Sequence, residues 1–368
     1  MVDAVRPWLF GDGNYSTPPS TTVALNYEKE LSDTISCYVE REINGIYELT
    51  MQYPITGVLY SSIALRSILY VSPDEYTGRQ MFRIYKITKP LNGIVTIYAR
   101  HIAYDLDGIV CEPFTASGIQ NALSGIISNS IPSNYFTFST TRTTASTFTV
   151  VHPDNVWSLM AGQAGSLLDV YGGEFDFDNY TISLENRIGA DNGVVIEYGK
   201  NIKALRQDED GSNMVKAIYP YYYTEDDGLV DLPEKVLVNV PSLFWNVYKA
   251  VDLTDRFQGG APTENELRTA AQAYLDNNVT WQPKISLDVD FVPLWQTQEY
   301  EGDAREVVHL GDTVTIKYTA LGVNATARAM AYKYNCLKER YEKITVGSVK
   351  ADLTDAIRQV IGAYNGEF

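Results

Sequence analysis

The chain has 368 residues, 45% of them hydrophobic and 20% charged, which is the composition of a folded protein of several domains. Acidic residues outnumber basic ones by 46 to 29, and a net charge of -17 argues against a protein that grips nucleic acid, because phosphates are neutralised by Lys and Arg. Three widely spaced cysteines provide no disulfide framework. The N-terminus lacks the pattern of a signal peptide, and no apolar window approaches the ~20 residues of a membrane helix.

The first third of the chain predicts β-structure. Asn44-Gly45 lies between two alternating runs within residues 35–54, and Asn-Gly favours the two-residue type I′ turn of a hairpin. Residues 82–102 repeat the pattern around Asn92-Gly93. One face of the outgoing strand is apolar and carries Val95, Ile97 and Ala99. With a short strand at 68–71, these hairpins predict a small sheet or barrel that ends near Asp105.

The middle third predicts an α+β unit. A first helix is indicated by the helical spacing of Ile119, Leu123, Ile126 and Ile127, and Pro132 prevents its continuation. Asp154 is the expected N-cap of a second helix that runs from Trp157 to Leu168 and stops at Gly172-Gly173. Three short strands should follow, with turns at Asp178-Asn179 and at 189–193.

The last third returns to strands around one helix. A hairpin is expected to turn at 208–212, and Thr263 with Glu266 forms the capping box of the helix. One face of that helix is apolar and consists of Leu267, Ala270, Ala271 and Tyr274. Strands are predicted at 285–294, 312–318, 325–335 and 340–348, and a short helix carries Ile357, Val360 and Ile361. The order of a short strand before two longer ones, at 68–102 and again at 312–348, suggests an internal duplication.

The acidic residues Glu174, Asp176 and Asp178 alternate along a predicted strand and share one of its faces. Carboxylates in this arrangement can bind a divalent cation or work as an acid–base pair. A half-buried strand also presents such a face to water, and we favour that interpretation. His101 belongs to a strand, so a structural hydrogen bond is favoured over a role as general base with Asp105.

The remaining candidate sites are weak. Asp208 and Asp210 resemble the start of a calcium loop, but its twelfth position is Tyr219 instead of a bidentate Glu. Cys37 has no sequence cue to a histidine partner, and His152 and His309 are isolated. No nucleotide-binding loop or nucleophile elbow occurs. We therefore expect no catalytic residue, no cofactor and no metal.

Several segments, in order and spacing, resemble the baseplate-hub proteins of long-tailed bacteriophages: the N-terminal hub region of tail-associated lysins and the prophage endopeptidase tail family. The most characteristic is SLLDVYGGEFDFDNYTISL at 166–184. The others are YELTMQYP at 47–54, ARHIAYDL at 99–106, VDLPEKVLV at 230–238, TENELRTAAQAYL at 263–275, LGDTVTI at 310–316 and RYEKITVGS at 340–348.

The resemblance implies a β-rich α+β, multidomain chain with two tail-tube-like β-barrel or sandwich domains and two inserted α+β domains. By this mapping the tube-like domains are residues 1–105, and 201–235 with 286–350. The inserted parts are 106–200 and 236–285, and residues 351–368 form a helix or link to a downstream region.

The same resemblance implies a structural role at the virion tail tip after synthesis in the cytoplasm of the bacterial host. It implies a homotrimeric ring. The partners of this ring are the distal tail protein ring, the tape-measure protein and a downstream fibre, spike or lysin. DNA is expected to pass through the ring without specific binding, and this chain is not expected to insert into a membrane. Any lytic activity of relatives is expected in a C-terminal region beyond Phe368. The alternative is a peptidoglycan hydrolase or peptidase that uses Glu174, Asp176 or Asp178, or a module that binds the cell wall.

Overall fold

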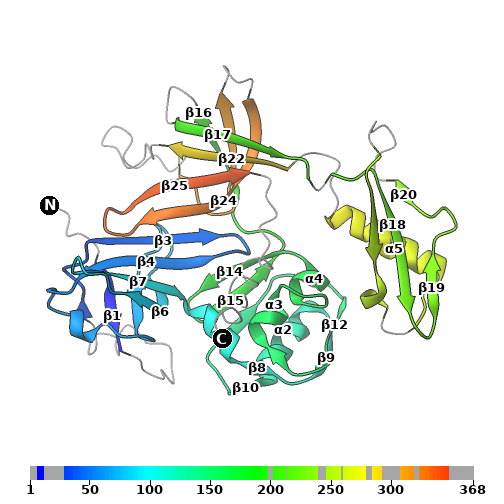
Figure 1. The fold of residues 1–368 in the computed structure, drawn as a ribbon, viewed down its shortest axis with the longest axis horizontal. Coiled ribbons are helices and arrows are strands. Elements are labelled where there is room, and N and C mark those ends of the chain that lie inside the picture. The colour runs from blue at the N-terminus through cyan, green and yellow to red at the C-terminus, as the bar shows by residue number, and fades with distance from the viewer. Residues whose placement is uncertain are drawn as a thin grey trace. The chain divides into compact units, whose positions relative to one another are not determined.

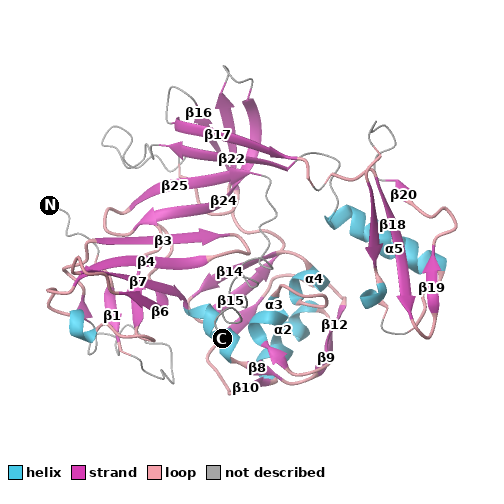
Figure 2. Ribbon diagram, in the orientation of Figure 1, coloured by secondary structure: helices cyan, strands magenta, loops and turns pink. Residues whose placement is uncertain are grey.

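The structure, a computed structural model, describes residues 6–11, 29–197, 202–212, 214–238, 246–257, 260–278, 284–291, 307–318 and 323–347. The chain divides into two compact units. The larger unit consists of Met1–Arg206 with Asp288–Phe368, and the smaller unit of Gln207–Leu287. Strands predominate in both (Figures 1 and 2), which confirms the β-rich fold class expected from the sequence.

Five consecutive strands form what we call the first repeat. They are β3 (Ser36–Glu42), β4 (Tyr47–Pro54), β5 (Ile68–Val71), β6 (Gln80–Thr88) and β7 (Ile94–His101), with the 3-10 turn η1 (Tyr60–Ser62) before β5. Their order in the sheet is β3-β4-β7-β6-β5. The alternation predicted for β7 is confirmed, because Val95, Ile97 and Ala99 are fully buried. Beyond β5 the sheet continues with β1 (Trp8–Phe10) and β2 (Lys29–Glu30).

Five later strands form the second repeat. They are β17 (Ile202–Asp210), β22 (Lys284–Phe291), β23 (Thr313–Tyr318), β24 (Val323–Asn335) and β25 (Arg340–Gly347). Their order in the sheet is β17-β22-β25-β24-β23. If the five strands of each repeat are numbered along the chain, both repeats have the same spatial order, 1-2-5-4-3. This common order supports the internal duplication that the sequence suggested. β16 (Asp191–Glu197) pairs with β23 in parallel.

The two repeats also agree in local detail beside their third strands. Arg83 donates to the carbonyl oxygen of Arg66 at 2.8 Å, and Arg328 donates to that of Gly311 at 3.2 Å. Arg66 and Gly311 both have positive φ, 69° and 87°. Each lies two residues before its strand, so the same irregular connection has formed twice.

The fourth strand of each repeat carries a bulge at the matching place. The register of β6 against β7 shifts between Ile84 and Lys86, and that of β24 against β25 shifts between Ala329 and Ala331. A bulge bends its strand and strengthens the twist. Ile84 therefore matches Ala329 and Arg83 matches Arg328, so β6 and β24 can be aligned around their bulges.

Residues 102–190 form a module between the repeats, which we call the middle module. Its helical elements are η2 (Ile102–Gly108), α2 (Ile119–Ser128), α3 (Val156–Met160) and α4 (Leu167–Tyr171). Its strands are β8 (Val110–Cys111), β9 (Phe114–Ser117), β10 (Ser130–Ile131), β11 (Thr137–Ser139), β12 (Thr147–Val150), β13 (Asp154–Asn155), β14 (Glu174–Asp178) and β15 (Thr181–Glu185). The predicted helix α2 is confirmed and buries Ile119, Leu123 and Ile126.

The single helix predicted from Trp157 to Leu168 is wrong, because α3 and α4 are separate. Between them Gly162 and Gly165 adopt φ of 99° and 80°, a conformation that a helix excludes. Ser166 caps α4 by accepting a hydrogen bond from the Asp169 amide. The predicted N-cap Asp154 instead lies in β13, and the residue before α3 is Asn155.

The smaller unit contains β18 (Ala217–Thr224), β19 (Gly228–Asp231), β20 (Leu237–Val238), β21 (Tyr248–Asp252), η3 (Thr254–Arg256) and α5 (Glu264–Asn278). The capping box of α5 is confirmed: the Thr263 amide donates to Glu266 Oε2 at 2.8 Å. Leu267, Ala271 and Leu275 of the helix are buried in the core of this unit.

The hairpin predicted to turn at 208–212 is wrong, since its two strands join different sheets. β17 neighbours β22 in the large sheet, whereas β18 pairs with β19, β20 and β21. For this reason the smaller unit begins at Gln207, earlier than the 236 expected for the inserted segment. The predicted helix at 353–364 lies outside the described residues.

Candidate functional site

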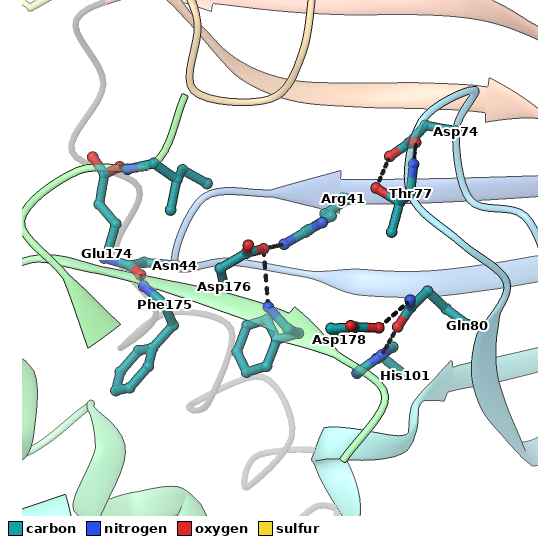
Figure 3. A network of polar contacts seen from close by, with 12 residues as sticks. Arg41, Asn44, Asp74, Thr77, Gln80, His101, Glu174, Phe175, Asp176 and Asp178 are labelled. Atoms are coloured by element: carbon teal, nitrogen blue, oxygen red, sulfur yellow. Dashed lines mark hydrogen bonds and ion pairs between the residues drawn. The ribbon is translucent and has the colours of Figure 1, made fainter. Parts of the chain in front are cut away.

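The three acidic residues of β14 hold the middle module to both repeats. Figure 3 shows the contacts of Asp176 and Asp178 with the first repeat. Glu174 pairs with Arg328 of the second repeat, with its two carboxylate oxygens 2.6 and 2.9 Å from the guanidinium nitrogens. Its Oε2 also accepts from the Ile188 amide at 2.8 Å. The Glu174 side chain is 14% exposed. A solvated face is therefore the wrong interpretation for Glu174.

Asp176 and Asp178 reach the first repeat instead. Asp176 forms an ion pair with the buried guanidinium of Arg41 on β3. Asp178 accepts from Gln80 Nε2 on β6 at 2.8 Å. Figure 3 shows Asp176 directed at Arg41 and Asp178 directed at Gln80, so the two carboxylates have different partners. An acid–base pair needs two carboxyl groups that converge on one substrate atom, and this arrangement does not provide that.

Asn44 forms a further link between β14 and the first repeat. Its Nδ2 donates to the Gly173 carbonyl at 2.9 Å, and its Oδ1 accepts from the Phe175 amide at 2.8 Å. Asn44 has φ of 50°, but Gly45 does not adopt positive φ, and the loop spans the four residues between β3 and β4. The hairpin is thus confirmed, while its two-residue type I′ turn is wrong because Asn44 is positioned to dock β14.

His101, at the end of β7, is buried and hydrogen-bonded at both ring nitrogens. Nε2 lies 3.1 Å from Gln80 Oε1, and Nδ1 accepts from the Ala103 amide at 3.2 Å. These partners define a neutral imidazole with its proton on Nε2. Burial, and then the nearby charge of Arg41, hold the pKa of His101 well below its usual range.

An aromatic stack surrounds this histidine. The Tyr47 ring lies parallel to the imidazole at 4.5 Å between centroids, and the Arg41 guanidinium covers Tyr47 at 4.6 Å. Phe177 of β14 contacts the same stack, 5.9 Å from the imidazole centroid. His101 is therefore a packed structural residue of the contact between the first repeat and the middle module.

The other residues weighed from the sequence lie apart from one another. Asp105 accepts from Arg83 Nε at 2.8 Å. His309 packs against the Tyr76 ring at 4.2 Å, and His152 Nδ1 lies 3.3 Å from the Pro153 carbonyl oxygen. Asp210 accepts from the Ser212 amide at 2.8 Å in the turn after β17. Among the described residues, no group of three His, Cys, Asp or Glu side chains could hold a metal ion.

A second contact, besides the Glu174–Arg328 pair, joins the middle module to the second repeat. Asp312, almost fully buried, accepts from the amides of Ala190 at 2.7 Å and His309 at 2.9 Å. Gly189 and Gly311 approach so closely that a Cβ on Gly189 would lie 2.1 Å from the carbonyl carbon of Gly311. Both residues have positive φ. In the sequence Gly189 indicates only a turn, and nothing local connects it with Gly311.

The two repeats meet through a ladder of backbone hydrogen bonds. β24 pairs antiparallel with β3, from Ala331 opposite Glu42 to Asn335 opposite Tyr38. Lys333 Nζ lies 2.5 Å from Glu40 Oε1 across this ladder. The two repeats therefore belong to one continuous sheet.

Cys37 and Cys336 end the same ladder. The Cys336 amide donates to the Cys37 carbonyl at 2.9 Å, and both thiols are buried and reduced. Hydrogen bonding to Cys336 and burial raise the pKa of the Cys37 thiol. Cys37 has a cysteine neighbour rather than a histidine, which the wide spacing in the sequence concealed.

Within the described ranges, no helix is long and apolar enough to span a membrane.

Residues 255–357 match the family described as the prophage endopeptidase tail. Among solved structures, the chain is similar to prophage tail protein gp18 from Listeria monocytogenes EGD-e, with 18% identity, a TM-score of 0.63 and coverage of 98% of this chain and 100% of that one. A 43 kDa tail protein of prophage MuSo2 from Shewanella oneidensis has 11% identity and a TM-score of 0.61, with 95% and 98% covered.

The tail protein from Neisseria meningitidis MC58 has 10% identity and a TM-score of 0.56, with 96% and 99% covered. No curated protein matches the chain. The family match over residues 255–357 and the folds shared with these tail proteins agree with the resemblance seen in the sequence. The chain matches the prophage endopeptidase tail family over residues 255–357, and at these low identities the solved structures show that the fold is shared over nearly its whole length.

Proposed function

We propose that the chain is a structural protein of the phage tail tip, the hub at which the tail tube ends. In this role its working surfaces are interfaces between proteins, and it turns over no substrate. The tail-protein fold over nearly the whole chain supports a structural place in the virion tail.

The observation that carries the proposal is the duplication of one five-stranded sheet within a single chain. Three copies of such a chain contribute six similar repeats. A ring of three chains can then dock on a sixfold tail tube with a similar surface at each of six positions, which a single-repeat trimer cannot do. We therefore propose a homotrimeric ring in which each tube-like domain is built on one repeat.

The proposed partners follow from this place in the tail. The distal tail protein ring contacts one end of the hub, and a fibre, spike or lysin contacts the other. The tape-measure protein, and later DNA, pass through the centre. The net charge of -17 suits such a path, because like charges keep DNA from adhering to the protein.

No observation favours the alternative of a wall hydrolase. Each of the three β14 acids considered for it has a different structural partner, namely Arg328, Arg41 or Gln80. Replacing all three acids by Asn or Gln on a full-length chain tests this alternative directly. Loss of a measurable wall-degrading activity would restore it.

The test of the hub is native mass, by light scattering over a concentration series, with negative-stain images of the same sample. We expect a species of three chain masses that images as a ring with a central hole. A chain that stays monomeric up to millimolar concentration would contradict a ring made by this protein alone.

A further inference from the structure

Among the described residues, no strand pairs with one half of β6 on its outer side. β5 pairs with β6 only from Gln80 to Arg83, and the connection before β5 bonds to Ile84. From Tyr85 to Thr88, β7 lies on the inner side, and within the described residues no strand pairs on the outer side. Tyr85 there is 41% exposed.

The matching half of β24 is covered. By the bulge correspondence, Tyr85 to Thr88 match Met330 to Lys333. That stretch pairs with β3, the first strand of the other repeat, and its Met330 carbonyl accepts from the Ile43 amide at 2.9 Å. The protein therefore shows what this surface binds: the first strand of a neighbouring repeat.

The first strand of the second repeat, β17, is the outermost strand of the sheet. In the part of the chain that the structure describes, β22 is its one neighbour. As far as the described residues show, a copy of the chain thus has a fourth strand with an unpaired outer half in one repeat and a first strand with an unpaired edge in the other. These are the two sides of the junction that β24 and β3 form internally.

We propose that the outer half of β6 in one copy pairs antiparallel with β17 of the next copy, which repeats the β24–β3 junction between chains. This inference rests on the proposed ring and names the surfaces that close it. The contact is head to tail, because different surfaces of the two copies meet, and such contacts generate closed rings when the rotation per copy permits.

Charge complementarity supports this occupant. The exposed end of β6 carries Lys86, and Lys89 follows it. β17 ends in three acidic residues, of which Asp208 and Asp210 have exposed side chains. The internal junction has the same polarity, with Lys333 of the fourth strand paired with Glu40 of the first. Opposite charges across neighbouring strands stabilise their pairing and fix its register.

The internal junction also defines which backbone groups of β6 face the next copy. The Met330 carbonyl and the Cys336 amide both bond to β3, and alternate residues of an antiparallel strand face the same neighbour. The amide of Tyr332 therefore faces β3. Its counterpart in β6 is Ile87, so by the same correspondence we place the Ile87 N–H on the outer side of β6. A proline at that position removes one intermolecular hydrogen bond and leaves the β6–β7 ladder complete.

The experiment uses two blocked variants and their mixture. Ile87→Pro, with Lys86→Glu as a second variant less demanding on the backbone, blocks β6. The double substitution Asp208→Lys with Asp210→Lys blocks β17. Lys338→Glu, which reverses an exposed charge in the turn between β24 and β25, is the matched control. Circular dichroism establishes that each variant is folded, and light scattering gives the masses.

We expect each blocked variant to associate about tenfold more weakly or worse, and Lys338→Glu to assemble like the parent chain. A mixture of Ile87→Pro with the Asp208→Lys/Asp210→Lys variant retains one intact pair of surfaces, so it should form dimers and stop there. Unchanged assembly of folded blocked variants would overturn the inference while leaving the ring intact. A monomeric parent chain would instead count against the ring, and with it this interface.

Discussion

Substitution of the Glu174–Arg328 pair measures how firmly the middle module is held to the second repeat. We consider Glu174→Gln, Arg328→Met and the double variant. The two side chains are 14% and 24% exposed, so the pair lies between the buried and the exposed limits. Breaking a buried pair costs about 3–5 kcal/mol and an exposed one about 0–1 kcal/mol. We expect each single substitution to lower the free energy of unfolding by about 2–3 kcal/mol.

The double variant should lose less than the sum of the two, because the second substitution removes a charge that the first left unpaired. The coupling energy should be about 1–2 kcal/mol. Urea unfolding followed by circular dichroism measures these values, and hydrogen exchange of residues 186–190 localises the loss. Asp226→Asn, on an exposed turn, is the matched control and should stay within about 0.5 kcal/mol of the parent. Single variants that match this control, or full additivity, would refute the structural assignment of Glu174.

Three further outcomes test other parts of the fold. Gly189→Ala should lower the thermal unfolding temperature far more than Gly193→Ala. Both glycines have positive φ, but only a Cβ on Gly189 would meet Gly311. Equal effects would contradict the close contact between Gly189 and Gly311. Because the pKa of His101 is lowered in the fold, the unfolded state binds more protons below about pH 6.5, and stability should fall with decreasing pH by up to about 1.4 kcal/mol per unit. That slope between pH 7.5 and 5 should be shallower in His101→Gln, and identical slopes would count against a buried neutral imidazole. Thr263→Ala should cost about 1 kcal/mol and speed hydrogen exchange in the first turn of α5, whereas unchanged exchange there would speak against the capping box.

Local sequence patterns predicted the elements that local physics determines. The hairpin of β3 and β4, the helix α2 and the capping box of Thr263 each depend on residues a few positions apart. The continuous helix after Trp157 failed for a related reason, because the helical apolar spacing took no account of Gly162 and Gly165.

The long-range pairing could not be read in the same way. β17 and β18 have the spacing of a hairpin, but β17 neighbours β22 in the large sheet, whereas β18 pairs with β19, β20 and β21. The acids of β14 alternate like a solvated face, and their partners Arg41 and Arg328 lie far away in the chain. Periodicity reports which face of a strand a residue occupies, but not what lies opposite that face.

The smaller unit occupies a place in the second repeat that a short loop occupies in the first. β3 and β4 are joined by the four residues around Asn44, whereas the equivalent strands β17 and β22 are joined by the smaller unit. The chain leaves the sheet through β17 and returns to it through the neighbouring strand β22, so the smaller unit is an insertion between two neighbouring strands. Its gain, loss or exchange in evolution needs no change in the strand order of the sheet, and the two repeats can diverge in what they carry while their scaffold stays the same.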